Sequence, residues 1–535
     1  MVQEREESDY ILSWGKNSAS DDGPQVMLHR IKEAQKRGAK LIVIDPRQEG
    51  LGKIADWWIP ITPGSDGALA LAILKMIISS GRYDHEFVEK YTRGFEEFKA
   101  YLDTQTMEQL SKWCGISVTD IEKLTDIFCS TAKIPLVAYT GLEYQLSAIQ
   151  NNRAIFVLWA ITGKLDAPGA IYLNAKGLET PKLFEIPEDD KPIGVDEFPL
   201  FYKFSGLGQF SRFPKAVLED EPYPVRGLMI LGGSPVLSFP DSKSWREAYK
   251  KLDCLIVLDR YFTEDARYAD VVFPACSLFE VPKAVPGPEG PHIVEPLIEP
   301  VGESKNDVLI MGAIAKKLGF GDKLPQTEEE LRSWLLSGTA PYAGDFGTSA
   351  DQKKEKHYKK YETGELRADG KPGFPTPSGK LEICSTILEE NGFVPYPEYK
   401  DVRSIPELAG KEYPFTMTSG ARSNNRMGVF GANLDKIAEI EPYPFVDINA
   451  EDAKEIGIED GDMVKVITPF ADGTFKAKIR GIARHAIHIP HGGGSAYMAE
   501  PWKNGNVNDL CSLDYADPMT GFVLIKSVPC RVEKV

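Results

Sequence analysis

LIVIDPRQEGLGKIADWWIP (residues 41–60) and LIVLDRYFTEDARYADVVFP (residues 255–274) are two copies of one pattern. Each copy runs Leu-Ile-Val-x-Asp, nine residues, then Ala-Asp-x-x-x-Pro. An apolar stretch that ends in a glycine-containing loop, ILSWGKN or LMILGGSP, precedes each copy. A fixed internal spacing that recurs far along the chain predicts a duplicated structural unit. The equivalences are Asp45 with Asp259, Asp56 with Asp270, and Gly15–Asn17 roughly with Gly232–Ser234.

The pattern also predicts a chemistry. A carboxylate at the carboxyl end of a strand can bind a ribose or a guanine edge, and a glycine loop lets backbone N–H groups approach phosphate. Two copies therefore predict two nucleotide-bearing ligands related by an approximate two-fold axis. The alternative is a duplicated αβ architecture that binds no ligand.

Strand and helix patterns alternate over the first ~165 residues, as in a parallel sheet covered by helices. They resume near residue 227, after a stretch (170–225) that we expect to form loops. We expect the polar stretch 351–373 to be an exposed excursion, that is, a segment that leaves the folded body. Short strands and turns follow from about residue 412. We expect Rossmann-like doubly wound α/β domains related by an internal pseudo-two-fold repeat, plus a C-terminal β-barrel of the double-psi type. The expected domains are 1–168, 169–408 and 409–535.

Composition excludes several function classes. The net charge of −17 disfavours nucleic acid as a partner, because nothing offsets phosphate repulsion. No apolar run reaches the roughly 18 residues of a membrane span. The acidic start lacks an export signal, so we expect a cytoplasmic location. The seven cysteines contain no Cys-x-x-Cys pair, so the sequence predicts neither a zinc nor an iron–sulfur site. We expect no metal-ligating residue in this chain.

Several further stretches follow in a family order: WGKN, VIDPR, ITPGSDGALALAI, GLEYQ, GGSP, PTPSGKLEI, MTSGAR and GNVNDL. This ordered set resembles the molybdopterin oxidoreductases of the dimethyl-sulfoxide-reductase family, with "TGKLDAPG" nearer to an acetylene-hydratase-like branch. The resemblance implies a bis-molybdopterin guanine dinucleotide cofactor that holds molybdenum or tungsten. It implies cofactor-binding residues in three groups: Gly15, Asn17, Asp45, Arg47, Gly64 and Asp66, with Gly141; Gly232, Ser234, Asp259, Thr263 and Glu264; and Ser419, Gly420, Arg422 and Asn508 in the barrel.

Some of these residues have structural alternatives. Asp66 is also placed to cap the helix that begins at DGALALAI, and Thr263-Glu264 to act as a capping pair. Arg47 has the alternative of a solvated loop charge. Asp265 stands where the family usually has Thr, and its charge would be unfavourable beside a phosphate. The catalytic residues stay unknown, and His485, His491 and Arg422 are the candidates.

In the family, an iron–sulfur domain and the segment with the metal-ligating side chain precede the WGKN equivalent. Only fourteen residues precede Gly15 here, and none is Cys. We therefore expect a [4Fe-4S] cluster and the metal ligand in an N-terminal segment or in a separate electron-transfer subunit. The alternatives are a longer gene read through a selenocysteine codon and a degenerate fragment. The expected activity is two-electron chemistry on a small molecule. The alternatives are a non-catalytic subunit of a redox complex and a non-redox hydratase.

Overall fold

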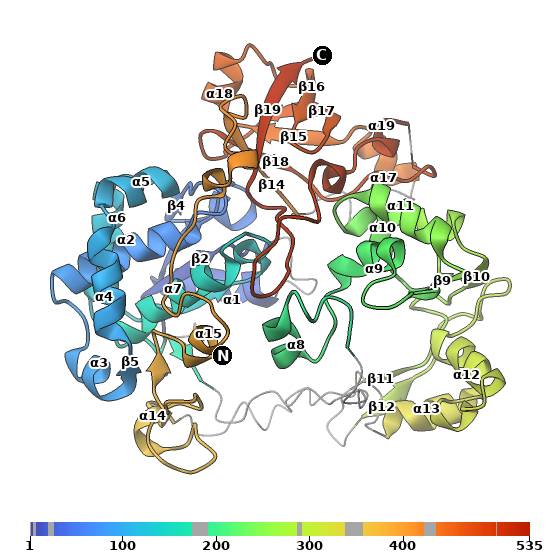
Figure 1. Cartoon of the computed structure of the whole chain (residues 1–535), viewed down its shortest axis with the longest axis horizontal. Helices are drawn as coiled ribbons and strands as arrows, with labels where there is room; N and C mark the ends of the chain where they lie inside the picture. Colours follow the sequence, from blue (N-terminus) through green and yellow to red (C-terminus); the bar gives the residue numbers. More distant parts are fainter. Residues whose placement is uncertain are drawn as a thin grey trace.

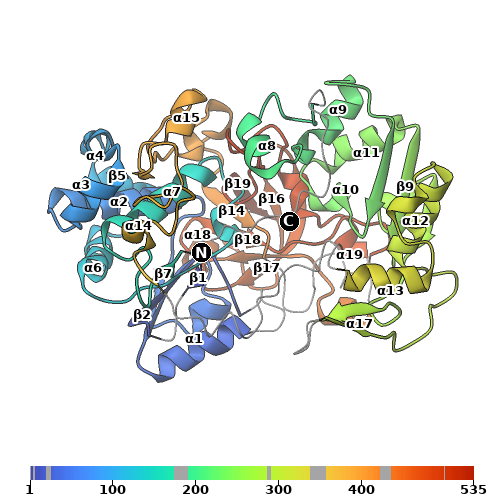
Figure 2. The same ribbon diagram turned by 90° about the horizontal axis from the view of Figure 1, so that it is seen from below.

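Three bodies make up the computed structural model of this chain (Figure 1), which describes residues 2–3, 7–19, 26–173, 191–285, 291–337, 357–421, 435–498 and 500–535. The N-terminal body (blue and teal) and the central body (green and yellow) lie on opposite sides, and the C-terminal barrel (orange and red) lies above both. The view from below places the barrel between the two α/β bodies (Figure 2). This arrangement confirms the expected fold class of α/β bodies with a terminal barrel.

The first body is built on a parallel sheet of order β4-β3-β2-β6. Its strands alternate between two buried faces: Leu12 and Ile42 pack toward α2 and α7, whereas Ile11 and Leu41 pack toward α1. Burial on both faces explains why these strands are apolar throughout. The strands are β2 (Tyr10–Trp14), β3 (Lys40–Ile44), β4 (Trp57–Ile59) and β6 (Leu136–Ala138), and the three helices are α1 (Val26–Lys36), α2 (Asp66–Ser79) and α7 (Ala148–Ile161).

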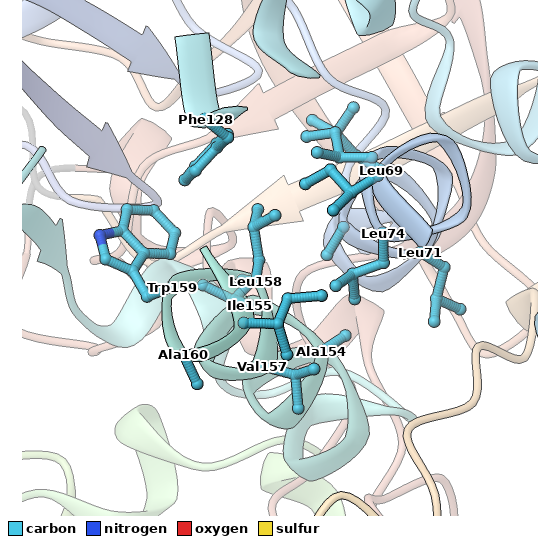
Figure 3. Packing of buried hydrophobic residues seen from close by; sticks show 14 of the residues in the cluster. Leu69, Leu71, Leu74, Phe128, Ala154, Ile155, Val157, Leu158, Trp159 and Ala160 are labelled. Carbon is cyan, nitrogen blue, oxygen red and sulfur yellow. The ribbon is translucent and has the colours of Figure 1, made fainter. Parts of the chain in front are cut away.

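Helices α2 and α7 form the centre of this body, and their side chains interdigitate in Figure 3. Helix α2 is apolar almost all round, which is the pattern of a helix buried on every side, and α7 is apolar from Ala154 to its end. Each fully buried Leu or Ile there contributes roughly 1.5–3 kcal/mol. Four further helices pack around this pair, and side chains of Asp84, Thr106 and Ser117 cap three of them. They are α3 (His85–Tyr91), α4 (Phe95–Thr104), α5 (Met107–Cys114) and α6 (Val118–Cys129).

The second body contains a parallel sheet of order β10-β9-β8, which repeats the strand order and the register of β4-β3-β2 in the first sheet. Ile42 lies opposite Trp57 in the first sheet, and Ile256 lies opposite Val271 in the second. The internal repeat predicted from the sequence is therefore confirmed in the backbone. The strands are β8 (Gly227–Leu231), β9 (Cys254–Asp259) and β10 (Val271–Pro274); the helices beside them are α9 (Phe213–Glu219), α10 (Pro235–Ser238) and α11 (Ser242–Lys251).

Beyond β10 the chain forms a small antiparallel pair and two helices. These are β11 (Lys283–Val285), β12 (His292–Val294), α12 (Asp307–Lys317) and α13 (Glu328–Leu336). The stretch 170–225 was expected to form loops, but it also contains α8 (Pro199–Ser205) and α9. Each of these helices has Pro in its first turn and buries apolar residues such as Leu200 and Val217, so tertiary burial decides their structure.

Residues 357–400 return to the first body, although they lie within the range 169–408 that we expected for the second domain. Tyr361, Phe374 and Ile383 belong to the core of the first body. Lys360, expected in an exposed excursion, is buried with its Nζ 2.5 Å from Asp166 Oδ1. The elements here are α14 (Lys360–Thr363), β13 (Leu381–Glu382) paired with β5 (Thr92–Arg93), and α15 (Thr386–Glu390); β1 (Val2–Gln3) pairs with β7 (Ile171–Tyr172).

The C-terminal body is a closed barrel of order β14-β18-β15-β17-β16-β19. The pairs β14–β18 and β15–β17 are parallel, and the other neighbouring pairs are antiparallel. Its strands are β14 (Phe415–Ser419), β15 (Phe445–Ile448), β16 (Met463–Ile467), β17 (Asp472–Ile479), β18 (Ala486–Ile489) and β19 (Val528–Lys534), with helices α17 (Asp435–Ile440), α18 (Ala450–Glu455) and α19 (Glu500–Lys503).

Candidate functional site

A cavity of about 400 Å³ lies at the carboxyl ends of the first sheet, where the first body meets the barrel. Its volume is in the range typical of ligand sites, and the carboxyl end of a parallel sheet is where such sites form. The sequence-predicted residues that line it together are Gly15, Asn17, Asp45, Arg47, Gly64, Asp66 and Gly141 from the first body and Ser419 and Gly420 from the barrel. His488 and Lys526 of the barrel are among the other residues that line it.

Two glycine loops meet at the floor of this cavity. Gly15 follows β2 with φ +63°, and its N–H donates to Ile44 O at 3.1 Å. Gly141 follows β6, and its N–H donates to Gly15 O at 2.9 Å. A Cβ at Gly141 would lie 2.1 Å from Gly15 O and 2.4 Å from Gly15 Cα, both backbone atoms. Only glycine allows this approach, which brings bare backbone to the cavity wall.

The charged groups of the cavity fall into two classes. Asp45 Oδ1 accepts from Arg47 N at 2.9 Å, and this hydrogen bond folds the loop after β3. The side chains of Arg47 and Lys526 line the cavity. Asp66 instead accepts from Trp14 Nε1 (2.8 Å) and Gln145 Nε2 (2.9 Å). Burial raises the pKa of Asp66, and these contacts give its carboxylate a role in holding the loops together. The cap proposed for Asp66 is not formed by its side chain.

His488 is a wall residue that the sequence did not single out. Of the three clustered histidines, the candidates His485 and His491 flank β18, whereas His488 lies within the strand and is buried. Its Nδ1 is 2.9 Å from Asp447 Oδ2, and desolvation lowers the pKa of His488 to about 4. The ring is therefore neutral, with Nδ1–H donating to the carboxylate. The available signal was a histidine inside an otherwise apolar strand, Ala-Ile-His-Ile, all four residues of which are buried.

The second body repeats the loop geometry of the first. Gly232 follows β8 with φ +59°, and its N–H donates to Leu258 O at 2.9 Å, as Gly15 does to Ile44. Asp259 Oδ1 accepts from Tyr261 N at 3.0 Å, as Asp45 does from Arg47 N. Both halves thus present the same glycine turn beside the same aspartate. The repeat therefore extends to the atoms that the sequence predicted would bind a dinucleotide.

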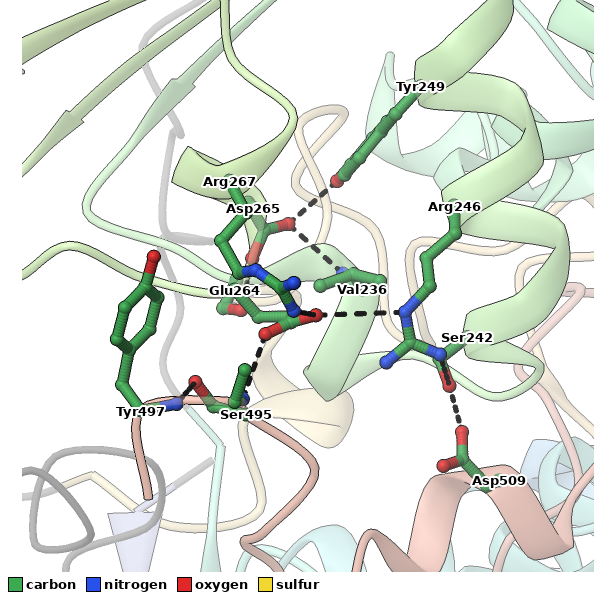
Figure 4. Close-up of polar contacts among 12 residues, drawn as sticks. Val236, Ser242, Arg246, Tyr249, Glu264, Asp265, Arg267, Ser495, Tyr497 and Asp509 are labelled. Carbon is green, nitrogen blue, oxygen red and sulfur yellow. Dashed lines mark hydrogen bonds and ion pairs between the residues drawn. The ribbon is translucent and has the colours of Figure 1, made fainter. Parts of the chain in front are cut away.

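The side chains around the second loop bind one another (Figure 4). Asp265 is buried, and its carboxylate accepts from Tyr249 OH at 2.8 Å, from Val236 N at 3.2 Å and from the Ser234 hydroxyl. Burial raises the pKa of Asp265. The carboxylate thus points into the body, where three donors bind it. The sequence had suggested that the charge of Asp265 would be unfavourable beside a phosphate, and these donors satisfy that charge.

Thr263 and Glu264 support the same loop. Thr263 Oγ1 accepts from Ala266 N at 3.2 Å, which is the capping contact that the sequence offered as the alternative. Glu264 is buried beside Arg267 (2.9 Å), and its Oε2 accepts from Ala496 N of the barrel at 3.0 Å. Asn508 Nδ2 donates to Leu237 O at 2.7 Å. These contacts join the second body to the barrel.

The predicted site residues therefore form two groups. One lines the cavity above. The other lies around the loop of the second body and does not line that cavity among the described residues: Gly232, Ser234, Asp259, Thr263, Glu264 and Asn508. Arg422 lies outside the described residues. His485 lies on the surface near Asp452, with 3.6 Å between Nδ1 and Oδ1.

Within the same described ranges, no group of three or more His, Cys, Asp or Glu side chains is placed to hold a metal ion. No helix there has the length and apolar character to cross a bilayer.

The cavity suits an anionic, nucleotide-like group. Its wall combines glycine backbone, the Arg47 and Lys526 cations and the amino end of α2, whose dipole favours negative charge. His488 Nε2 is buried and has no hydrogen-bond partner in the described structure, which is a costly state for a polar atom unless a ligand supplies the partner. The residues present therefore fit a dinucleotide.

Comparison with known proteins shows which protein families this chain resembles. The chain matches the description "Molybdopterin oxidoreductase" over residues 2–317 and "Molydopterin dinucleotide binding domain" over residues 416–529. The probable oxidoreductase YoaE of Bacillus subtilis is 30% identical over 85% of this chain and 65% of its own. Acetylene hydratase of Syntrophotalea acetylenica is 27% identical over 91% of this chain and 70% of its own. The F420-dependent formate dehydrogenase subunit alpha of Methanocaldococcus jannaschii is 28% identical over 91% and 72%.

Among solved structures, acetylene hydratase from Pelobacter acetylenicus superposes with a TM-score of 0.79 over all of this chain and 79% of its own, at 23% sequence identity. That likeness concerns the fold. This chain spans about two thirds of the length of the curated relatives above, from 65% for YoaE to 72% for the formate dehydrogenase subunit. Since the first family match covers more than half of the 535 residues, the chain belongs to the molybdopterin oxidoreductase family, whose members are molybdopterin-dependent enzymes.

Proposed function

We propose that the chain is the cofactor-holding portion of a molybdenum or tungsten enzyme and binds two molybdopterin guanine dinucleotides, one per copy of the repeat. The observation that carries this proposal is the shared backbone geometry of the two glycine loops and of Asp45 and Asp259 behind them. One dinucleotide would lie in the cavity against Gly15, Gly141 and the barrel. The other would lie against Gly232 and Asp259.

The proposed roles follow from the contacts of each residue. Arg47 and Lys526 would neutralise phosphate charge in the cavity, and Asp45 would orient a sugar or base by hydrogen bonding. His488, held by Asp447 with Nε2 as an acceptor, would accept from a ligand N–H or O–H. When bound, the metal-carrying cofactor supplies two-electron chemistry, while the protein orients the cofactor and excludes water.

Two parts of the proposed enzyme, the metal ligand and the iron–sulfur cluster, would come from outside this chain. The metal-ligating side chain and a [4Fe-4S] cluster would come from polypeptide outside these 535 residues, either an upstream segment or an electron-transfer subunit. The formate dehydrogenase relatives are themselves named as subunits. We propose two-electron redox chemistry on a small molecule, and the similarity to acetylene hydratase keeps hydration as the second candidate.

The test is the dinucleotide content of the protein purified from a host that makes molybdopterin guanine dinucleotides. We expect two dinucleotides per chain, with molybdenum or tungsten present when the complete complex is isolated. Asp45→Ala and Asp259→Ala should each lose about one dinucleotide, and the double variant both. Wild-type protein without pterin would overturn the proposal, as would single variants that keep both dinucleotides.

The repeat supplies matched controls for these variants. Asp56 and Asp270 belong to the same copies, but their carboxylates accept from Leu41 N (2.9 Å) and Leu255 N (2.7 Å) at the opposite ends of the strands. Asp56→Asn and Asp270→Asn should therefore keep both dinucleotides. Reduction of an electron-accepting dye with a small substrate, compared with hydration of acetylene, would then separate the two candidate activities of the complete enzyme.

A further inference from the structure

In the part of the chain that the structure describes, the second sheet has no counterpart of one strand of the first sheet. By the repeat, β8 corresponds to β2, β9 to β3 and β10 to β4. In the first sheet β6 pairs in parallel with the outer edge of β2, with Leu12 opposite Leu136. In the second sheet no described strand pairs with the outer edge of β8. Among the described residues, nothing therefore takes the position equivalent to β6.

One face of the second sheet is also open. The face toward α11 is closed, because Ile230, Leu255 and Val257 are at most 5% exposed. The opposite face carries Leu231, 47% exposed, and Val271, 41% exposed. On the corresponding face of the first sheet, Leu12, Trp14, Ile42 and Ile44 are at most 2% exposed beneath α2 and α7.

The chain provides only part of the cover for this face. Helix α12 follows β10 as α2 follows β4, and Figure 2 places it beside the sheet, on the side away from α11. It buries Leu309 and Ile310, and Leu258 in the central strand is buried, yet Leu231 and Val271 stay exposed. In the described chain, no helix takes the position that α7 has in the first body.

We propose that the outer edge of β8 and this apolar face form a docking surface for a strand–helix segment of another polypeptide. An open strand edge offers unpaired N–H and C=O groups, and an added strand satisfies them while apolar side chains cover the face. The first body defines the geometry of the occupant: β6 runs parallel to β2 and leads into the apolar helix α7. The inference goes beyond the proposed function and does not depend on a bound cofactor.

Two observations favour this occupant over a second copy of the chain. The curated relatives compared above have 28–35% of their length outside the match, which is ample for a strand and a helix. Two copies meeting edge to edge about a two-fold axis would pair β8 with β8 in antiparallel fashion, whereas the repeat requires a parallel strand.

The experiment compares the recombinant chain alone with the protein isolated from its native cells through a mild affinity tag. Hydrogen exchange should be at least 100-fold faster in β8 than in the equivalent β2 for the chain alone, because only β2 has strands on both sides. In the native complex, exchange in β8 should slow at least tenfold. Cys254 is an exposed thiol in β9 and lies on the open face, because it is two residues from Ile256 on the same strand. It should therefore react with a thiol reagent in the chain alone and be protected in the complex.

Variants test the surface itself. Leu231→Lys with Val271→Lys should leave the unfolding of the isolated chain unchanged, because both side chains are solvent-exposed, but should abolish co-purification of the second polypeptide and the protection of β8. Val535→Lys, at an exposed apolar residue after the last barrel strand, is the control and should change neither.

Four outcomes would overturn the proposal: slow exchange of β8 in the isolated monomer, unprotected β8 in the native protein, protection by a second copy of the same chain, or protection that survives the double lysine variant. Pterin content is measured separately. Loss of the docking surface and failure of the proposed function are therefore distinguishable.

Discussion

Replacement of Gly141 by alanine tests the glycine contact on which the first binding site depends. The new Cβ would lie 2.1 Å from Gly15 O, 2.4 Å from its Cα and 2.5 Å from its C. Nonbonded carbon contacts need about 3.5 Å, so the two loops would have to separate by about 1 Å. The N–H of Gly141 would then lose its 2.9 Å bond to Gly15 O. Overpacking costs about 1–3 kcal/mol and a lost hydrogen bond about 1 kcal/mol, so we expect the unfolding free energy to fall by about 2–4 kcal/mol.

The assay is urea unfolding of the purified chain followed by fluorescence, with pterin content measured on the same preparation. Gly233→Ala, in the loop of the second body, is the matched control, because its nearest atom would be a side-chain carbon at 3.8 Å. It should change the unfolding free energy by less than about 1 kcal/mol. Gly141→Ala should also lower the dinucleotide content. A Gly141→Ala protein with wild-type unfolding and wild-type pterin would refute the argument that this contact shapes the site.

Three other substitutions probe buried polar groups. Lys360→Met leaves the buried Asp166 carboxylate without its cation and should cost about 3–5 kcal/mol in urea unfolding, while Lys360→Met with Asp166→Leu should recover most of that loss. Asp265→Ala removes the acceptor of three donors; pterin analysis should find one dinucleotide lost and the cavity dinucleotide retained. The pKa of His488 is lowered to about 4 in the folded chain, so the unfolded chain binds a proton first as pH falls from about 6.5 to 4, and stability falls over that window. His488→Gln should flatten this slope of urea midpoint against pH, and an unchanged slope would assign it to other groups.

The sequence predicted the backbone of the duplicated unit better than the roles of its side chains. Each copy contains two aspartates at fixed spacing, and spacing alone does not tell a binding carboxylate from a structural one. The structure separates them by position along the strand. Asp56 and Asp270 bind backbone N–H groups at the start of β3 and β9, whereas Asp45 and Asp259 lie after the carboxyl ends.

Features that depend on distant residues were harder to predict. Lys360 lies in a polar stretch, and its burial depends on Asp166, which is 194 positions away in sequence. Local polarity therefore indicated an exposed excursion where the chain in fact closes the first body. His488 shows the same limit, because its contact with Asp447 depends on the neighbouring strand β15 and its neutral state depends on burial, which local sequence does not reveal.

The two copies of the repeat have diverged in what their side chains bind, while their backbones have not. In the first copy the loop after β2 rests on Gly141, and the site side chains face a shared cavity with the barrel. In the second copy Asp265 and Glu264 bind groups of the protein itself, and these bonds hold the loop after β8 and join it to the barrel. A loop held by close backbone contact does not tolerate added atoms, whereas a loop held by side-chain hydrogen bonds does not tolerate their removal. The loop after β2 should therefore be more sensitive to an added methyl group than the loop after β8, although one backbone pattern builds both.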